Sequence, residues 1–226
     1  MADTTPQNGT ATIATDDIGG VHYQRVKLIH GADGVNAGDV SAANPLPTTL
    51  RSAGAAYSLF LPAVAAGANK VFFDLFNASG SGKTAKIKSI RAIKDGSVAV
   101  VGTLSVKLYL TRTTAVGTGG TAAVENGTSL TAPAISEHDT ASAALPAQIT
   151  ARAAPSGGAT AGAVICERHV FTEETNASTY DRVEFLLPEG LDVEPLVVRE
   201  GEGVRVVQGA IASVGNIGFH VVFELV

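Results

Sequence analysis

The feature that most constrains this chain is a regular alternation of apolar and polar residues in several short runs. In LSVKLYL, residues 104–110, every second side chain is apolar, with Ser105, Lys107 and Tyr109 between them. The run FHVVFELV, residues 219–226, repeats this pattern. A period of two residues is that of a β-strand with one buried face, because successive side chains point to opposite faces. Both runs therefore predict half-buried strands.

Other β-rich runs predict the same fold class. VFFDLF is expected to bury Val71, Phe73 and Leu75 on one face, and residues 183–187 and 195–210 read as further strands. Gly, Asn and Asp punctuate these runs, and neither a long helical stripe nor alternating βα units is present. The sequence predicts an all-β protein, an antiparallel, jelly-roll-like β-sandwich with an extended N-terminal arm. The residues expected to lead its core are Phe73, Leu75, Leu104, Val106, Leu108, Leu110, Phe185, Phe219, Val221 and Phe223.

Composition divides the chain into two parts. Residues 1–50 hold few large apolar side chains, which predicts an extended arm, while residues 51–226 are expected to form the sandwich domain. Within that domain, residues 113–162 are mostly Ala, Gly, Thr, Ser and Pro, with few charges. Disordered linkers usually carry more charge. This stretch is therefore expected to fold as a long excursion against the sandwich itself or against a neighbouring subunit.

The strand-like run of the arm, VHYQRVKLI at residues 21–29, carries apolar residues on both parities. A strand buried on one face keeps its parity, so the slip indicates either a bulge or an extended segment that contacts two surfaces in turn. Such a segment gains stability by adding to an existing sheet or by lying in a groove between subunits. The predicted partner-binding residues are Tyr23, Val26 and Leu28 for apolar contacts, and Arg25 and Lys27 for acidic neighbours.

Charge and hydropathy limit the partners. The 226 residues carry a formal net charge of -5, whereas nucleic-acid binders normally carry a basic surplus. Only 16% of the residues are charged, which favours surfaces that are buried against protein partners. No apolar stretch is long enough to span a bilayer, and the polar N-terminal residues do not resemble a signal peptide. We therefore expect no nucleic-acid partner, no membrane partner, and synthesis in the cytoplasm.

The string NASGSGKT, residues 77–84, raises the question of nucleotide binding. A phosphate-binding loop needs G-x-x-x-x-G-K-[ST], and the position of its first glycine is occupied by Asn77. Such a loop also opens a helix, whereas the residues after Thr84 are strand-like. The string is expected to form a hairpin turn with flanking lysines, without a nucleotide cofactor.

No other motif indicates chemistry. The histidines lack metal-binding spacing, and Cys166, the only cysteine, lies three residues from His169, so their side chains are expected on opposite faces of a strand. No catalytic residue, metal or cofactor is predicted, and the chain is expected not to be an enzyme. A basic cluster is expected to be either a solvated strand face or a patch for an acidic partner. Its residues are Lys83, Lys86, Lys88, Arg91 and Lys94.

One segment resembles a known class of protein. ATDDIGGVHYQRVKLIHGADGVNAGDVSAANPLP, residues 14–47, resembles an N-terminal segment of virion structural proteins of tailed bacteriophages. The matching features are Asp16-Asp17, Gly19-Gly20, the core VHYQRVKL, the Gly31–Gly34 turn and Asn44–Pro47. VFFDLFNASGSGKT and GNIGFHVVFELV are more loosely similar to accessory head or tail proteins of the same phages.

The resemblance implies a non-enzymatic protein that is assembled on a virion in the host cytoplasm. The first expectation is a capsid decoration, or cement, protein that binds the major capsid protein on the outside of the head. It would be a homo-oligomer, expected as a trimer. The alternatives are a tail or fibre-anchoring protein and a carbohydrate-binding module for host adsorption. Against the last stand the absence of Trp and an aromatic content of 5%.

Overall fold

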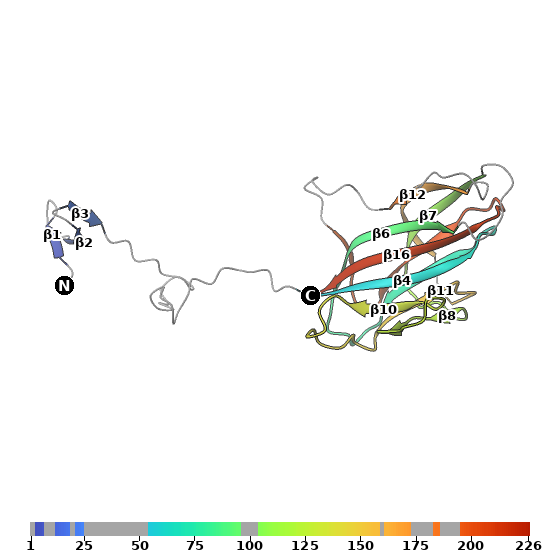
Figure 1. The fold of residues 1–226 in the computed structure, drawn as a ribbon, viewed down its shortest axis with the longest axis horizontal. Helices are drawn as coiled ribbons and strands as arrows, with labels where there is room; N and C mark the ends of the chain where they lie inside the picture. The colour runs from blue at the N-terminus through green and yellow to red at the C-terminus, as the bar shows by residue number, and fades with distance from the viewer. Residues whose placement is uncertain are drawn as a thin grey trace. The chain divides into compact units, whose positions relative to one another are not determined.

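The computed structural model describes residues 3–6, 12–18, 21–24, 54–95, 104–158, 161–172, 183–185 and 195–226. Within these ranges the regular elements are all β-strands. No helix in them is long and apolar enough to cross a membrane. The chain divides into two compact units, Met1–Arg51 and Ser52–Val226 (Figure 1).

The first unit contains a small antiparallel sheet. Its strands are β1 (Asp3–Pro6), β2 (Thr12–Ile18) and β3 (Val21–Gln24), paired in chain order. The sequence had indicated a strand-like run at residues 21–29, and β3 covers its first four residues, while residues 25–29 lie outside the described part of the chain. These strands follow one another closely in the sequence, so their pairing is local and needs little apolar surface.

The second unit is a sandwich of two sheets, as predicted. The seven-stranded sheet has the order β13-β6-β16-β4-β10-β9, and β14 also pairs with β6. All of its pairs are antiparallel except β10 with β9. Its strands are β4 (Ala55–Ala65), β6 (Ala85–Asp95), β9 (Val124–Glu125), β10 (Ala134–Glu137), β13 (Val183–Glu184), β14 (Leu196–Val198) and β16 (Asn216–Leu225).

The six-stranded sheet is antiparallel throughout, in the order β12-β7-β15-β5-β11-β8. Its strands are β5 (Val71–Asn77), β7 (Leu104–Thr113), β8 (Thr121–Ala122), β11 (Ile149–Ala153), β12 (Ala161–Thr172) and β15 (Glu202–Gln208).

The pairing order is that of a jelly roll. The first strand of the sandwich pairs with the last, β4 with β16, and the second pairs with the one before the last, β5 with β15. Moving inward along the chain, β6 pairs with β14 and β7 pairs with β12. A long antiparallel ribbon rolled in this way produces the two sheets of a jelly roll. The predicted jelly-roll-like sandwich is confirmed.

The excursion at residues 113–162 packs on its own sandwich. Its β10 adds to β4 in one sheet, while β11 adds to β5 in the other, and the two short strands β9 and β8 extend each sheet by one position. Ile135 and Ile149 bury their side chains in the common core. Of the two alternatives that the composition left open, the described residues support folding against the sandwich itself.

The buried core matches the alternation of apolar and polar residues along the strands, except where noted below. The predicted residues Phe73, Leu75, Val106, Leu108, Leu110, Phe185, Phe219, Val221 and Phe223 are all buried. Leu104 lies in β7, but its side chain is outside the described set. Phe219 lies at the centre, with its ring centroid 5.5, 5.2 and 6.0 Å from those of Phe72, Phe73 and Phe185. Aromatic rings tilted at such distances pack favourably.

β5 departs from the predicted one-sided burial. Phe73 and Leu75 face the core as expected, but Val71, predicted on the same face, is only half-buried and lines a surface hollow. Phe72, Asp74 and Phe76 are buried as well. A register shift in the pairing with β15 leaves Phe72 as an extra residue, and its ring also contacts Phe219. A bulge of this kind lets two successive side chains face the same way. Asp74 is buried beneath the loop that contains Gly117, whose N–H donates to its carboxylate.

The predicted hairpin at residues 77–84 is wrong. β5 and β6, which this segment joins, belong to different sheets, so the segment crosses from one layer to the other. The turn near Gly201 also crosses between the layers, because β14 pairs in the seven-stranded sheet and β15 pairs in the six-stranded sheet. The local residues favour turns in both cases, but the winding of the roll decides which sheet each strand joins.

Candidate functional site

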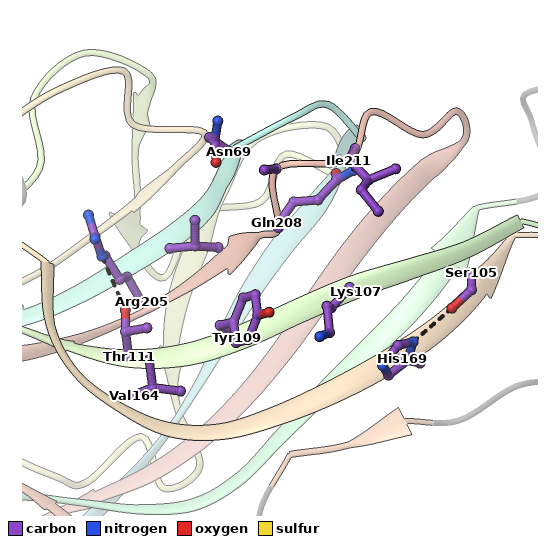
Figure 2. A pocket seen from close by; sticks show the side chains of 13 residues that line it. Asn69, Ser105, Lys107, Tyr109, Thr111, Val164, His169, Arg205, Gln208 and Ile211 are labelled. Atoms are coloured by element: carbon purple, nitrogen blue, oxygen red, sulfur yellow. Dashed lines mark hydrogen bonds between the residues drawn. The ribbon is translucent and has the colours of Figure 1, made fainter.

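A concave surface lies on the outer face of the six-stranded sheet. It is a hollow of about 730 Å³, with a floor from β7 and β15, one wall from β12, and a rim from Asn69 and the loop 209–211 (Figure 2). This volume is in the range of small-molecule sites in proteins, about 300–1,000 Å³.

The floor follows from the strand period. The outward positions of β7 are Ser105, Lys107 and Tyr109, and these side chains are exposed or half-buried. The alternation in LSVKLYL predicted this outward set correctly. Tyr109 lies opposite Val207 of β15, so an aromatic ring and an aliphatic side chain are neighbours on the floor.

The rim is held by a buried glutamine. Gln208 is 2% exposed, and its Oε1 accepts the N–H of Gly67 at 2.7 Å. Its Nε2 donates to Ile211 O at 2.9 Å and to Ser213 Oγ at 2.6 Å. The N–H of Asn69 donates to Gly209 O at 3.0 Å, which joins the same two loops a second time. These bonds organise the rim before any ligand arrives.

A chain of polar contacts crosses from β7 to β12 at one end of the hollow. Ser105 Oγ lies 2.8 Å from His169 Nδ1, as Figure 2 shows, and His169 Nε2 lies 3.1 Å from Glu167 Oε1. Lys107 Nζ lies 3.0 Å from the same Glu167 oxygen. The hydrogen bond from Lys107, and then that from His169, lowers the pKa of Glu167, while the bond to Glu167 raises the pKa of Lys107.

Serine, histidine and glutamate in series are also the groups of acyl-transfer enzymes. In those enzymes the carboxylate is reserved for the imidazole, which it orients and stabilises when charged. Here Lys107 occupies the Glu167 oxygen that His169 contacts, and Ser105 and His169 are both exposed. We interpret the set as a cross-strand polar network. That the chain is not an enzyme stays a prediction.

A buried carboxylate lies beside the other end of the hollow. Asp74 of β5 is 0% exposed, and its direct cross-strand neighbours are Arg205 of β15 and Arg152 of β11. Burial raises the pKa of Asp74, while the N–H of Gly117 and the charge of Arg152 oppose that shift. Gly117 N–H donates to Asp74 Oδ2, and a Cβ at Gly117 would clash with that oxygen. The carboxylate thus pins the loop before β8 onto the sheet.

A second hollow of about 390 Å³ shares Asn69 and Arg205 with the first, and Lys70 lines it as well. Arg205 Nε donates to Thr111 Oγ1 at 3.2 Å, which holds the guanidinium on the floor (Figure 2). The described residues that line the two hollows include lysine, arginine and histidine but neither aspartate nor glutamate.

The N–H groups of the glycine-rich loop at residues 78–84 already bind a carboxylate of the same chain, that of Glu200. Gly80 N–H donates to Glu200 Oε2 at 3.2 Å, and Gly82 N–H donates to Glu200 Oε1 at 2.5 Å. The φ angles of these two glycines are 87° and 63°, which glycine adopts without steric cost. Main-chain N–H groups in such turns form a nest for an anion. The strand predicted after Thr84 is confirmed as β6.

Replacing Glu200 by Gln is expected to lower Tm at pH 7. The N–H groups of Gly80 and Gly82 hold the pKa of Glu200 below its ordinary value of 4.5. A folded-state pKa below the unfolded one contributes stability above the unfolded pKa, and this contribution is lost as pH falls through the folded pKa. The difference in Tm between Glu200→Gln and the wild type should therefore become smaller below pH 4.5. Thermal unfolding of both proteins from pH 7 to below pH 4.5 measures this difference. Glu137→Gln removes a carboxylate outside the glycine-rich loop and serves as the control.

The predicted basic cluster lies mainly on the outer face of the seven-stranded sheet. Lys83 is in the glycine-rich loop, and Lys86, Lys88, Arg91 and Lys94 lie on β6. Lys88 Nζ is 2.8 Å from Glu224 Oε2, and Arg91 Nε is 3.1 Å from Glu184 Oε2. These acids offset part of the positive charge within the sheet itself. Whether the cluster meets an acidic partner stays a prediction.

The predicted arm site is only partly described. Tyr23 lies in β3, opposite Asp16 of β2. Arg25, Val26, Lys27 and Leu28 lie outside the described residues, so their role in partner binding stays a prediction.

The cysteine is free, as expected. Cys166 Sγ contacts Phe185 O at 3.2 Å and packs against the core, whereas His169 lines the outer hollow. The two side chains are therefore on opposite faces, as the spacing predicted. In the described part of the chain, no group of three or more His, Cys, Asp or Glu side chains is placed to hold a metal ion.

No protein-family model matches this sequence, and neither a curated protein nor a solved structure matches it. The function has to be inferred from the residues and contacts described above.

Proposed function

We propose that this chain is a non-enzymatic structural protein of a tailed-bacteriophage virion, where it decorates the outside of the head. The observation that carries the proposal is the N-terminal string at residues 14–47, joined to a jelly-roll sandwich that completes its own sheets. Its partners would be the major capsid protein and further copies of itself.

The architecture supports separate roles for the N-terminal segment and the sandwich. Among the described residues, β1, β2 and β3 pair only with each other, and the sandwich strands pair only within the sandwich. Jelly rolls of this kind build viral capsid domains. An N-terminal segment that attaches to a lattice and a domain that is displayed on it fit this organisation.

The surface supports self-association. Leu130, Val164 and Ile211 are 87%, 60% and 79% exposed, in a chain with only 16% charged residues. Exposed apolar groups on a weakly charged surface favour protein contacts. Contacts between copies, as in the expected trimer, would add avidity to each single attachment on a repeating shell.

Two alternatives remain open for the location. A tail or fibre-anchoring protein would use the same N-terminal segment on a different partner. A carbohydrate-binding adsorption module is favoured by one observation, the hollow that contains Tyr109.

The number of copies per particle decides between head and tail. A decoration protein follows the symmetry of the shell and is expected at hundreds of copies, whereas a tail protein is expected at about a dozen or fewer. Quantitative gel densitometry of purified virions, with the major capsid protein as internal standard, measures this ratio. A dozen or fewer copies would contradict decoration, and absence from the virion would contradict the whole proposal.

A further inference from the structure

The seven-stranded sheet carries opposite charges at its two sides. At one side, β6 contains one acid, Asp95, and several cations, which are Lys86, Lys88, Arg91 and Lys94. At the other side, β9, β10 and the turn after β10 contain Glu125, Glu137 and Asp139. Residues 113–151, which include this side, contain neither lysine nor arginine. We call β6 the basic strand, and β9 and β10 with Asp139 the acidic edge.

Within one copy, the two regions are too far apart to neutralise each other. The strand order places β16, β4 and β10 between β6 and β9 (Figure 1). Four strand spacings of about 4.8 Å amount to about 19 Å. This distance exceeds the Debye length at physiological ionic strength, about 8 Å, so the attraction between the two regions is largely screened. Their charges can therefore act on another molecule.

The acidic edge has no cation of its own. The carboxylates of Glu125, Glu137 and Asp139 accept hydrogen bonds from neutral groups, one side-chain amide and two main-chain N–H groups. Among the described residues, none of these three acids forms an ion pair. Burial raises the pKa of Tyr57, and the charges of Glu137 and Glu125 raise it further. A negative potential therefore remains at this edge.

The basic strand is neutralised only in part. Lys88 Nζ lies 2.8 Å from Glu224 Oε2, and Glu224 Oε1 accepts the N–H of Gly54. Lys86 is directly opposite Glu224 across the strands, but both carboxylate oxygens are thus engaged. In the described part of the chain, neither Lys86 nor Lys83 of the adjoining loop forms an ion pair. A positive potential therefore remains beside β6.

Each region also exposes an apolar side chain. Ile93 of β6 is 52% exposed, and Val124 of β9 is 58% exposed. Protein interfaces combine buried apolar groups with a polar rim. Complementary charges would orient the two surfaces, and apolar contact would add affinity.

We propose that copies of this chain associate head to tail, with the basic strand of one copy against the acidic edge of the next. A second copy suits both surfaces, because the same chain supplies both signs of charge. The contact joins two different surfaces and is therefore heterologous, and such contacts close into rings when the rotation between copies permits it. This inference rests on the self-association in the proposed function and names the surfaces that would form it.

Sedimentation velocity of the full chain measures the association. At low salt and about 100 μM protein, where even a weak contact is populated, we expect a species of several chains. Raising the salt from about 50 to about 500 mM should weaken the association at least about tenfold, because exposed charges are screened. A monomer at low salt, or an association that salt does not weaken, would overturn the proposal.

Charge reversals locate the contact. Lys86→Glu and Glu125→Lys are each expected to weaken self-association at least about tenfold, because an attraction becomes a repulsion. Lys70→Glu makes the same change beside the other sheet, where Lys70 lines the smaller hollow, and should leave the association unchanged. None of the three residues is in the core, and each variant is checked for an unchanged Tm. Equal weakening by Lys86→Glu and Lys70→Glu would contradict the proposed contact.

A mixture of the two weakened variants tests the head-to-tail geometry. Lys86→Glu keeps an intact acidic edge, and Glu125→Lys keeps an intact basic strand. The mixture should therefore form a species of two chains that neither variant forms alone. If no such species appears, the two surfaces do not pair. These measurements are made in solution, so their failure would leave the copy number per virion untouched, and a low copy number would leave them untouched.

Discussion

Deletion of residues 1–50 is expected to leave a folded sandwich that no longer co-sediments with virions. The first strand of the sandwich, β4, begins at Ala55, and the described sheets of residues 54–226 contain no strand from the first unit. The N–H of Gly54 already donates to Glu224 Oε1 at 3.0 Å, beside the C-terminal strand. The deletion therefore removes no strand pairing from the sandwich, while it removes the segment proposed to attach.

Two measurements are needed for this prediction. Circular dichroism and thermal unfolding report whether residues 51–226 fold, and co-sedimentation with particles that lack the protein reports attachment. In the full chain, the double variant Tyr23→Ala, Leu28→Ala tests whether the apolar contacts of the arm carry the binding. A truncated protein that still reaches wild-type occupancy would contradict the proposed role. A truncated protein that fails to fold would place part of the first fifty residues inside the sandwich.

Replacing Leu108 by Ala is expected to lower the free energy of unfolding by about 2–5 kcal/mol. Leu108 is 0% exposed, in the middle of β7, which pairs with β12 on one side and β15 on the other. Because neighbours on both sides fix the backbone, the cavity left by the deleted methyl groups can collapse only partly, and the lost contacts add to the lost transfer free energy.

Leu130 offers a matched control, since it is 87% exposed. The same substitution there should change the free energy of unfolding by less than about 0.5 kcal/mol. Urea unfolding of both variants, with unchanged m-values, gives the comparison. Similar losses at Leu108 and Leu130 would show that the assignment of the buried face is wrong.

Local patterns carried the prediction of the strands and their faces. Val106, Leu108 and Leu110 are buried and Lys107 and Tyr109 are not, as the alternation predicted. This was possible because the direction of a side chain along a strand is set by the backbone, whichever strand lies next to it. The same argument correctly predicted that the side chains of Cys166 and His169 lie on opposite faces of β12. It failed at Phe72, where a bulge set by the pairing with β15 changes the parity.

The candidate site could be predicted only in part. The outward set of Ser105, Lys107 and Tyr109 was visible in LSVKLYL, because it lies on one strand. No sequence signal linked these residues to His169, Arg205 or the loop of Ile211, since each comes from a different part of the roll. The presence of Glu200 in the glycine-rich loop was equally hidden, with about 120 residues between donors and acceptor.

The sequence by itself determined an all-β sandwich, the buried faces of its longest strands, the strand after the glycine-rich loop and the opposite orientations of Cys166 and His169. Each of these depends on interactions within a few residues. Only the tertiary structure decided which sheet each strand joins, that β5 and β6 lie in different layers, and that the excursion at residues 113–162 extends both sheets. These features depend on pairings between distant segments, whose free energies are set by the whole roll and not by any local run.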